Sequence, residues 1–366
     1  MREAAAKTVM ETPLAAVHKN AGASMGTWFG CALPDWFNED WMAEYRAARA
    51  SVALIDKNYR AYLRFGGPDR ARFLNAVLTN NIKDLTVGSG VVSLFLNPQG
   101  RIQAEIETYA TSESLFGVSY AMIRETLVPA LDKYIIMDDV TLADETELYG
   151  TVALEGPGAA ELVKKLSSVD LANLRELEFR EAPVSGISCG LTKRSPGGVA
   201  SAELLATRAD LPHLWGALEH EVGTAGGRAM GYRALNALRL EQGIPWFGYD
   251  FGEKQIPHEA GLQDSHISYT KGCYTGQEIV ERVRSRGQVN RVRVLLKFDG
   301  TEVPASGAAL SAEGKEAGYI TRSAYSPMLQ TPIAMGYVRR ENSAAGSELG
   351  FAAATAIVIT PPTPHP

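Results

Sequence analysis

The chain has 366 residues, too many for one ordinary hydrophobic core, so we expect two or three domains. Its formal net charge of −6 excludes a global attraction to nucleic acid or to anionic membranes. Three scattered cysteines form neither a CxxC pair nor a metal-ligand spacing, which argues against a disulfide framework and a structural zinc site and favours a reducing cytoplasm. No long apolar stretch follows the charged residues 1–7, so we expect neither a signal peptide nor a membrane span.

The first part of the chain alternates between short helical and strand patterns. Residues 41–53 predict a helix capped by Asp40, and residues 69–78 predict one capped by Asp69. Strand patterns occupy residues 60–65, 140–142 and 151–154, whereas residues 122–135 and 159–166 are helical in pattern. Residues 91–96 and 101–109 flank the turn at residues 97–100, which predicts a hairpin. A mixture without a regular βαβ rhythm indicates an α+β fold.

The second part of the chain passes from helical patterns to a loop and then to strand patterns. Residues 211–221 and 232–240 predict helices, and the glycine- and proline-rich residues 243–261 predict a loop. After residue 289, short strand patterns separated by turn residues predict a C-terminal β-barrel or sandwich; they occupy residues 292–298, 317–321, 333–338 and 355–359. The final six residues contain four prolines and are expected to form a frayed tail.

Six short motifs, in this order, resemble the T-protein of the glycine cleavage system, a folate-dependent aminomethyltransferase. They are Thr12-Pro13-Leu14 with His18, Asn80-Asn81 with the turn at 96–100, Val152 to Pro157, Leu238 to Glu241, Glu259 to Leu262, and Ser326-Pro327 with Ala334 to Val338. The resemblance implies a ring-like fold of three domains with folate in a central hole. The implied domains are residues 1–58 with 148–262, residues 59–147, a linking segment at 263–290, and a barrel at 291–366.

The sharpest motif is Lys271-Gly272-Cys273-Tyr274-Thr275-Gly276-Gln277-Glu278. It is similar to the signature of the YgfZ-type branch of the T-protein family, whose members bind folate and are implicated in maintaining certain iron–sulfur enzymes. The resemblance therefore implies tetrahydrofolate or a one-carbon-substituted folate as the ligand. It also implies iron–sulfur enzymes or assembly proteins as partners.

Glu241 is the expected anchor for the pterin, because a carboxylate can accept two hydrogen bonds from the amino and N–H groups of that ring. The alternative is a glutamate at a helix end that is solvated or paired with Arg239. By the resemblance, Arg239, Lys271 and Tyr274 are further folate contacts. Trp246 either stacks on the pterin or seals a core.

Glu105 is the expected acid–base residue. The T-protein family carries two aspartates on the strand after its glycine turn, and one of them is essential for aminomethyl transfer; Ala104 and Glu105 stand there in this chain. A glutamate can act as a general base, but a displacement of about 1 Å can lower a rate about 100-fold. The alternative is an outward strand position beside Glu107. Residues 195–198 also depart from the family pattern.

Cys273 and the arginines that follow it are the remaining candidates. Beside Lys271, the Cys273 thiol is a candidate nucleophile, redox sensor or metal ligand, although a lone cysteine is often a small buried hydrophobe. One thiolate cannot hold an iron–sulfur cluster. In an extended chain, Arg282, Arg284 and Arg286 would share one face and suit the carboxylates of a folate glutamate tail, or else protect a strand edge. Without interleaved aromatic residues, they do not suggest a nucleic-acid groove.

Three functions are compatible with the resemblance and with these residues. The first is a tetrahydrofolate-binding protein that supports the assembly or repair of iron–sulfur enzymes. The second is a tetrahydrofolate-dependent aminomethyltransferase, against which the departure at Ala104 and Glu105 counts. The third is a scaffold that has lost folate. His258 and His266 can each be a general base, a pterin contact or a purely structural residue, and no phosphate-loop or dinucleotide motif is present.

Overall fold

The computed structural model describes residues 9–195, 199–287, 289–352 and 354–361. The charged residues 1–7, part of the departure at 195–198 and most of the expected C-terminal tail lie outside these ranges. The chain divides into two compact units. Unit 1 is Met1–Gly67, Thr86–Gly90 and Tyr109–Ala234, and unit 2 is Pro68–Leu85, Val91–Thr108 and Leu235–Pro366.

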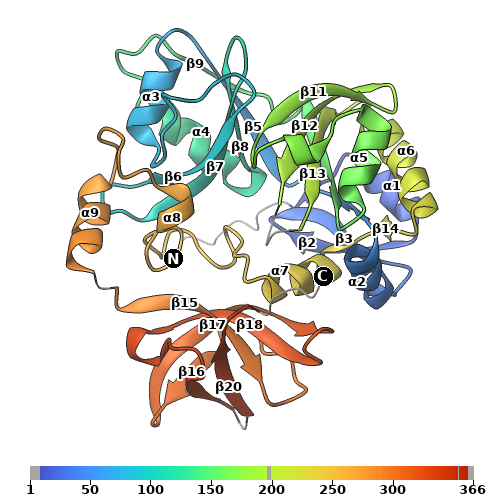
Figure 1. The fold of residues 1–366 in the computed structure, drawn as a ribbon. Coiled ribbons are helices and arrows are strands. Elements are labelled where there is room, and N and C mark those ends of the chain that lie inside the picture. Colours follow the sequence, from blue (N-terminus) through green and yellow to red (C-terminus); the bar gives the residue numbers. More distant parts are fainter. Residues whose placement is uncertain (1–8, 196–198, 288, 353, 362–366) are drawn as a thin grey trace. The chain divides into compact units, whose positions relative to one another are not determined.

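Unit 1 is built around a six-stranded sheet in the order β11-β12-β13-β10-β4-β14 (Figure 1). Its strands are β4 (Ala53–Asp56), β10 (Tyr149–Glu155), β11 (Phe179–Val184), β12 (Ile187–Arg194), β13 (Ser201–Thr207) and β14 (Arg228–Ala229). Helices α5 (Ala159–Ser167) and α6 (Leu211–Thr224) pack against this sheet. Because β4 is antiparallel to β10 and parallel to β14, the sheet is mixed, as an α+β fold allows.

Smaller elements complete unit 1. The strands β1 (Met10–Glu11), β2 (Ala23–Trp28) and β3 (Cys31–Phe37) form a sheet, and β5 (Arg60–Gly66) lies between β8 (Leu115–Tyr120) and β9 (Thr141–Asp144). The helices are α1 (Ala15–Asn20), α2 (Trp41–Ala50), η1 (Ala121–Ile123), α4 (Arg124–Asp132) and η2 (Leu171–Asn173). Asp40 caps α2 as expected, accepting a hydrogen bond from Ala43 N at 2.9 Å. The helix expected to reach residue 135 ends earlier, because tighter three-residue turns replace its helical bonds after Asp132.

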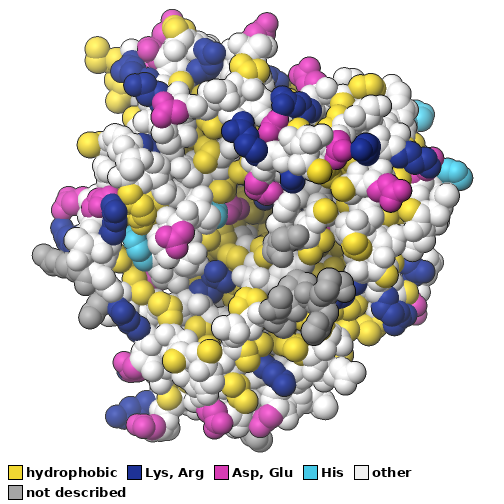
Figure 2. All heavy atoms as spheres, in the orientation of Figure 1, with side chains coloured by type: hydrophobic (Ala, Val, Ile, Leu, Met, Phe, Trp, Pro, Cys, Tyr) yellow, Lys and Arg dark blue, Asp and Glu magenta, His cyan; other side chains and the backbone are white. Residues whose placement is uncertain are grey.

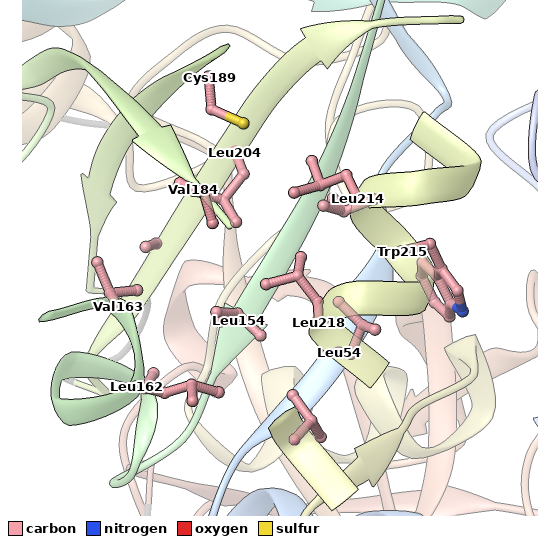
Figure 3. Packing of buried hydrophobic residues seen from close by; sticks show 14 of the residues in the cluster. Leu54, Leu154, Leu162, Val163, Val184, Cys189, Leu204, Leu214, Trp215 and Leu218 are labelled. Atoms are coloured by element: carbon pink, nitrogen blue, oxygen red, sulfur yellow. The ribbon is translucent and has the colours of Figure 1, made fainter. Parts of the chain in front are cut away.

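The core of unit 1 lies between the six-stranded sheet and its helices. Figure 3 shows apolar side chains from β4, β10 and β13 meeting those of α5 and α6. Trp215 on α6 is fully buried, and its ring lies nearly perpendicular to the ring of His18, with 4.7 Å between the ring centroids. Burying such side chains is the main favourable term in the stability of this unit.

Glu44 on α2 is a buried carboxylate that ties together two distant segments of unit 1. It is fully buried, and its two oxygens accept hydrogen bonds from the backbone N–H groups of Phe37 and Gly231. Burial raises the pKa of Glu44 from 4.5 to about 7, although the two backbone N–H groups oppose the shift. Glu44 therefore binds a proton more tightly in the folded chain than in the unfolded chain.

We expect this proton to make stability depend on pH. Between pH 4.5 and 7 the folded state holds a proton that the unfolded state has lost, so the contribution is complete below about pH 4.5 and is lost as the pH rises through about 7. The loss amounts to about 3 kcal/mol. Urea unfolding should be measured for the wild type and for Glu44→Gln across this pH range. The free energy of unfolding of the wild type should fall relative to that of the variant as the pH rises. A free-energy difference between the two proteins that stays constant with pH would contradict the assignment.

Unit 2 opens with α3 (Arg70–Val77) and the hairpin of β6 (Gly90–Leu96) and β7 (Ile102–Ala110), which the sequence predicts. Gly100 in the hairpin turn has a φ of +71°, a backbone conformation that favours glycine. Asp69 stands at the cap position of α3, but its side chain makes no capping hydrogen bond and instead pairs with Arg72 at 3.2 Å. The later helices are α7 (Tyr232–Glu241), α8 (Gln263–His266) and α9 (Gln277–Arg286), and residues 243–261 form the expected loop.

The C-terminal part of unit 2 is a closed six-stranded barrel, as expected. Its strands are β15 (Arg291–Phe298), β16 (Ala309–Ala312), β17 (Lys315–Ser326), β18 (Thr331–Arg339), β19 (Glu348–Phe351) and β20 (Ala354–Ile359), with η4 (Arg340–Asn342) after β18. Gly318 and Gly336 let β17 and β18 approach closely, because a Cβ atom on either would lie within 2.6 Å of a carbonyl oxygen on the other strand.

The surface carries both signs of charge. On the face drawn in Figure 2, lysine and arginine side chains are interspersed with aspartate and glutamate side chains among the described residues. None of the described helices combines the length and the apolar character that crossing a bilayer requires.

Candidate functional site

The motif Lys271 to Glu278 lies between α8 and α9 and continues into the first turn of α9. Its Cys273 side chain is exposed, whereas Cys31 and Cys189 are buried in unit 1. Burial raises the pKa of the Cys31 thiol to about 12 and that of the Cys189 thiol to about 11. Cys273 is therefore the one cysteine of the chain that a reagent or partner in solution can reach.

Lys271 fixes this motif to the C-terminal end of α3. Its ammonium group donates hydrogen bonds to the carbonyl oxygens of Asn75 and Leu78, both at 2.5 Å, and of Asn80 at 3.0 Å. A cation at this position complements the negative end of the helix dipole. Burial lowers the pKa of Lys271 to about 8. All three N–H donors have partners, so none remains for a folate oxygen while the motif stays in this position.

Tyr274 differs from Lys271, because its polar group has no partner in the described structure. The side chain is 6% exposed, and its hydroxyl group has no hydrogen-bond partner among the described residues. Burial raises the pKa of Tyr274, so the hydroxyl stays protonated and can donate. A buried hydroxyl without a partner is uncommon and suits a polar atom of a ligand.

Glu241 and Arg239 are both buried in unit 2, which excludes the solvated alternative for Glu241. The Oε1 atom of Glu241 accepts hydrogen bonds from Ser326 Oγ at 2.5 Å and from Met328 N at 3.3 Å. Arg239 forms its ion pair with Asp250, and the Trp246 ring lies 4.5 Å from its guanidinium. Arg239 and Trp246, two residues expected to bind folate, therefore already contact each other.

Asp250 is the centre of a buried polar network in unit 2. It is 1% exposed. One carboxylate oxygen accepts from Arg239 and from Trp246 N, and the other accepts from Thr321 Oγ1 at 2.6 Å. Arg239 also donates to Asn236 Oδ1, which lies 2.8 Å from its Nη2 atom. This network holds the loop at 243–261 against the barrel strand β17 within unit 2.

The arginines after the motif do not form the extended stripe that the sequence suggested, because residues 277–286 are helical. Side chains two positions apart on a helix point in nearly opposite directions. Arg282 pairs with Glu278 at 2.6 Å, and Arg284 pairs with Glu281 at 3.6 Å and lies over the Tyr269 ring. Both arginines are exposed to solvent, and each already interacts with residues of α9 or of the segment between α8 and α9.

Glu105 meets His266, two residues that are 161 positions apart in the chain. The Nε2 atom of His266 lies 2.9 Å from Glu105 Oε1, and its Nδ1 atom lies 2.7 Å from Ser265 Oγ. Ala104, the other residue at the family's aspartate pair, is fully buried. In the sequence, Glu105 and His266 are separate candidates, and Ser265 carries no signal of its own.

A second buried polar centre lies in unit 1. The Oδ2 atom of Asp56 lies 2.8 Å from His18 Nε2 and accepts from Thr12 Oγ1 at 2.6 Å, while its Oδ1 atom accepts from the backbone and side chain of Asn58. Among the described residues, no group of three or more His, Cys, Asp or Glu side chains is arranged to hold a metal ion.

Comparisons with known proteins identify relatives along the chain. The family described as the GCVT N-terminal domain matches residues 14–266, and the glycine cleavage T-protein C-terminal barrel domain matches residues 291–360. An aminomethyltransferase of Streptomyces avermitilis is 28% identical over 339 residues, which cover 92% of this chain and 91% of that protein. An aminomethyltransferase of Desulforamulus reducens is 27% identical over 344 residues, with 93% of each chain covered.

Among solved structures, the glycine cleavage system aminomethyltransferase T of Bartonella henselae matches with a TM-score of 0.86 and 22% identity. The match covers 96% of each chain. At this identity the likeness establishes the fold alone. The expected T-protein fold, α+β with a C-terminal β-barrel, is thereby confirmed.

Proposed function

Because the chain belongs to the glycine cleavage T-protein family, we propose that it binds tetrahydrofolate or a one-carbon-substituted folate and supports iron–sulfur enzymes in the cytoplasm. Binding of tetrahydrofolate in general is a property of this family. The finer assignment, to the YgfZ-type branch, rests on the motif Lys271 to Glu278.

The observation that carries this proposal is the placement of Cys273. It is the exposed thiol of the chain, it stands in the branch motif, and Lys271 ties that motif to α3 through three hydrogen bonds. The position of the family's aspartate pair is held by a buried alanine and by Glu105. Recognition of folate, with an exposed thiol presented on the motif, fits these residues better than aminomethyl transfer does.

Among the expected folate contacts, the Tyr274 hydroxyl is the strongest, because it is buried and has no described partner. Glu241 remains the proposed pterin anchor; its Oε1 atom already accepts a hydrogen bond from Ser326 Oγ. Arg282 and Arg284 are weaker candidates for contacts with folate, because each already has an acidic partner.

Calorimetric titration with tetrahydrofolate and 5-formyltetrahydrofolate tests the proposal. We expect micromolar binding, about −8 kcal/mol. Tyr274→Phe, which removes only the hydroxyl, should weaken binding about 10-fold, and Glu241→Gln should weaken it further. Lys164→Gln, which removes the exposed ion pair with Asp170 in unit 1, is the matched control and should bind like the wild type. If neither folate binds, the proposal fails, and the remaining alternative is a scaffold with this fold that has lost folate.

Support of iron–sulfur enzymes needs a separate test in cells. Loss of the gene should lower the activity of iron–sulfur enzymes, and the wild-type chain should restore it. A Cys273→Ala chain that restores activity equally well would show that the exposed thiol is not required.

A second candidate is aminomethyl transfer to tetrahydrofolate. It is favoured by the relatives, which are named aminomethyltransferases, and by the carboxylate of Glu105, which is paired with a histidine at 2.9 Å. Formation of methylene-tetrahydrofolate from an aminomethyl donor, lost in Glu105→Gln, would favour this candidate over the first.

A further inference from the structure

Three side chains of unit 2 form a continuous hydrogen-bonded array. Glu105 on β7 lies 2.9 Å from His266 Nε2, and Ser265 Oγ lies 2.7 Å from His266 Nδ1. The order is therefore carboxylate, imidazole and hydroxyl, with each neighbour within hydrogen-bond distance. A nucleophile bonded to a base, and a base bonded to an orienting carboxylate, are the contacts that activate a serine.

The carboxylate decides which imidazole nitrogen carries the proton. An ionised Glu105 can only accept a hydrogen bond, so the neutral His266 ring places its proton on Nε2. The lone pair is then on Nδ1, which faces Ser265 Oγ. The Ser265 hydroxyl must donate to this lone pair, and this is the direction in which a proton leaves a serine that attacks an electrophile.

The surrounding backbone holds the array in place. The hydroxyl of Thr79, a fully buried residue, donates to the carbonyl oxygen of His266 at 2.6 Å and accepts from Leu94 N at 2.8 Å. Asn80 Nδ2 donates to the carbonyl oxygen of Ser265 at 3.3 Å. The residues that carry the base and the hydroxyl are therefore tied to the hairpin strand β6, in the same unit as Glu105 on β7.

Exposure changes along the array. Glu105 is half-buried, His266 is 8% exposed and Ser265 is exposed to solvent. The base is thus protected from water, while the hydroxyl group is open to a substrate from outside.

We infer that Ser265 is an acyl-accepting nucleophile, with His266 as its general base and Glu105 as the residue that positions His266. The substrate class is an activated acyl group, an ester or a thioester. Ser265 Oγ forms a bond to the acyl carbon while its proton passes to His266 Nδ1. The bond to the leaving alcohol or thiol breaks, and the leaving group takes the proton from His266. Water then hydrolyses the acyl-serine, so the overall reaction is hydrolysis. This activity does not depend on folate binding.

A fluorophosphonate probe tests the inference directly on the wild-type chain. The serine oxygen bonds to phosphorus, fluoride leaves, and the proton passes to His266. Peptide mass spectrometry after native labelling should place the phosphonyl group on Ser265, and p-nitrophenyl acetate should be hydrolysed at the same site. Absence of the probe from Ser265, with or without labelling elsewhere, overturns the inference.

Variants then separate catalysis from structure. Ser268→Ala is the matched control, because Ser268 lies three positions away and its hydroxyl contacts only that of Thr270 among the described side chains; it should label at the wild-type rate on Ser265. His266→Ala should slow labelling roughly 100-fold, and added imidazole should restore part of the rate. Glu105→Gln should slow it about 10-fold or more, and Glu105→Asp, which keeps the charge, should retain more of the rate.

Unchanged labelling in His266→Ala contradicts the role of the base, and equal losses in Glu105→Gln and Glu105→Asp contradict the positioning role. Thermal unfolding of each variant identifies any that fail to fold. The labelling test on the wild-type chain does not depend on these variants.

Discussion

Replacing Asp250 with asparagine is expected to lower the free energy of unfolding by about 3–5 kcal/mol. Asp250 and Arg239 are 1% and 3% exposed, so removal of the carboxylate leaves a guanidinium buried without its counter-ion. Water cannot compensate this charge, because burial already lowers the pKa of Arg239 even with Asp250 present.

Urea unfolding measures this effect against two controls. The exposed pair Arg282–Glu278 is the matched surface control, and Glu278→Gln should lower stability by only about 0.5 kcal/mol. The double variant Arg239→Met with Asp250→Leu removes both charges and should be more stable than Asp250→Asn alone. An Asp250→Asn protein as stable as the wild type would show that this pair contributes little.

Replacing Trp215 with alanine should lower the stability of unit 1 by about 3–5 kcal/mol. Trp215 is fully buried in the core drawn in Figure 3, where it meets His18 and the side chains around Leu54 and Leu218. Close-packed surroundings relax only in part, so the substitution removes contact area and leaves a cavity.

Phenylalanine is the informative control at this position. The indole N–H of Trp215 is buried and has no hydrogen-bond partner among the described residues, so losing it sacrifices no hydrogen bond. Trp215→Phe should therefore lower stability by about 2 kcal/mol or less. If the phenylalanine and alanine variants unfold at the same urea concentration, the ring that phenylalanine retains contributes nothing to stability, and the argument from packing is wrong.

The sequence predicts local elements well, because their signals are local. The Asp40 cap, the hairpin turn that ends at Gly100 and the short alternating runs of the barrel each depend on residues a few positions apart. Helix α9 is an exception, as are the Asp69 cap and the end of α4. The alternating arginines of α9 suit a strand, but the pairing of Glu278 with Arg282 four positions later suits a helix.

The candidate sites were harder to predict, because they depend on residues that are distant in the chain. Lys271 reaches Asn75 across 196 positions, and His266 reaches Glu105 across 161. No periodic pattern encodes such contacts. The resemblance to a family pointed to Glu105, to Asp250 as part of a branch-like segment and to the cysteine motif, but Ser265 belongs to no motif that the sequence makes visible. The limits of the three domains proposed from sequence stay a prediction.

The contrast among the three cysteines has a practical consequence for spectroscopy. A maleimide dye or spin label added to the native wild-type chain should attach at Cys273 alone, since the other two thiols are buried and hold their protons. No cysteine needs to be removed first. The attached reporter would stand inside the motif itself, two residues from Lys271, and its signal would report directly on whether a ligand or a partner changes the surroundings of that motif.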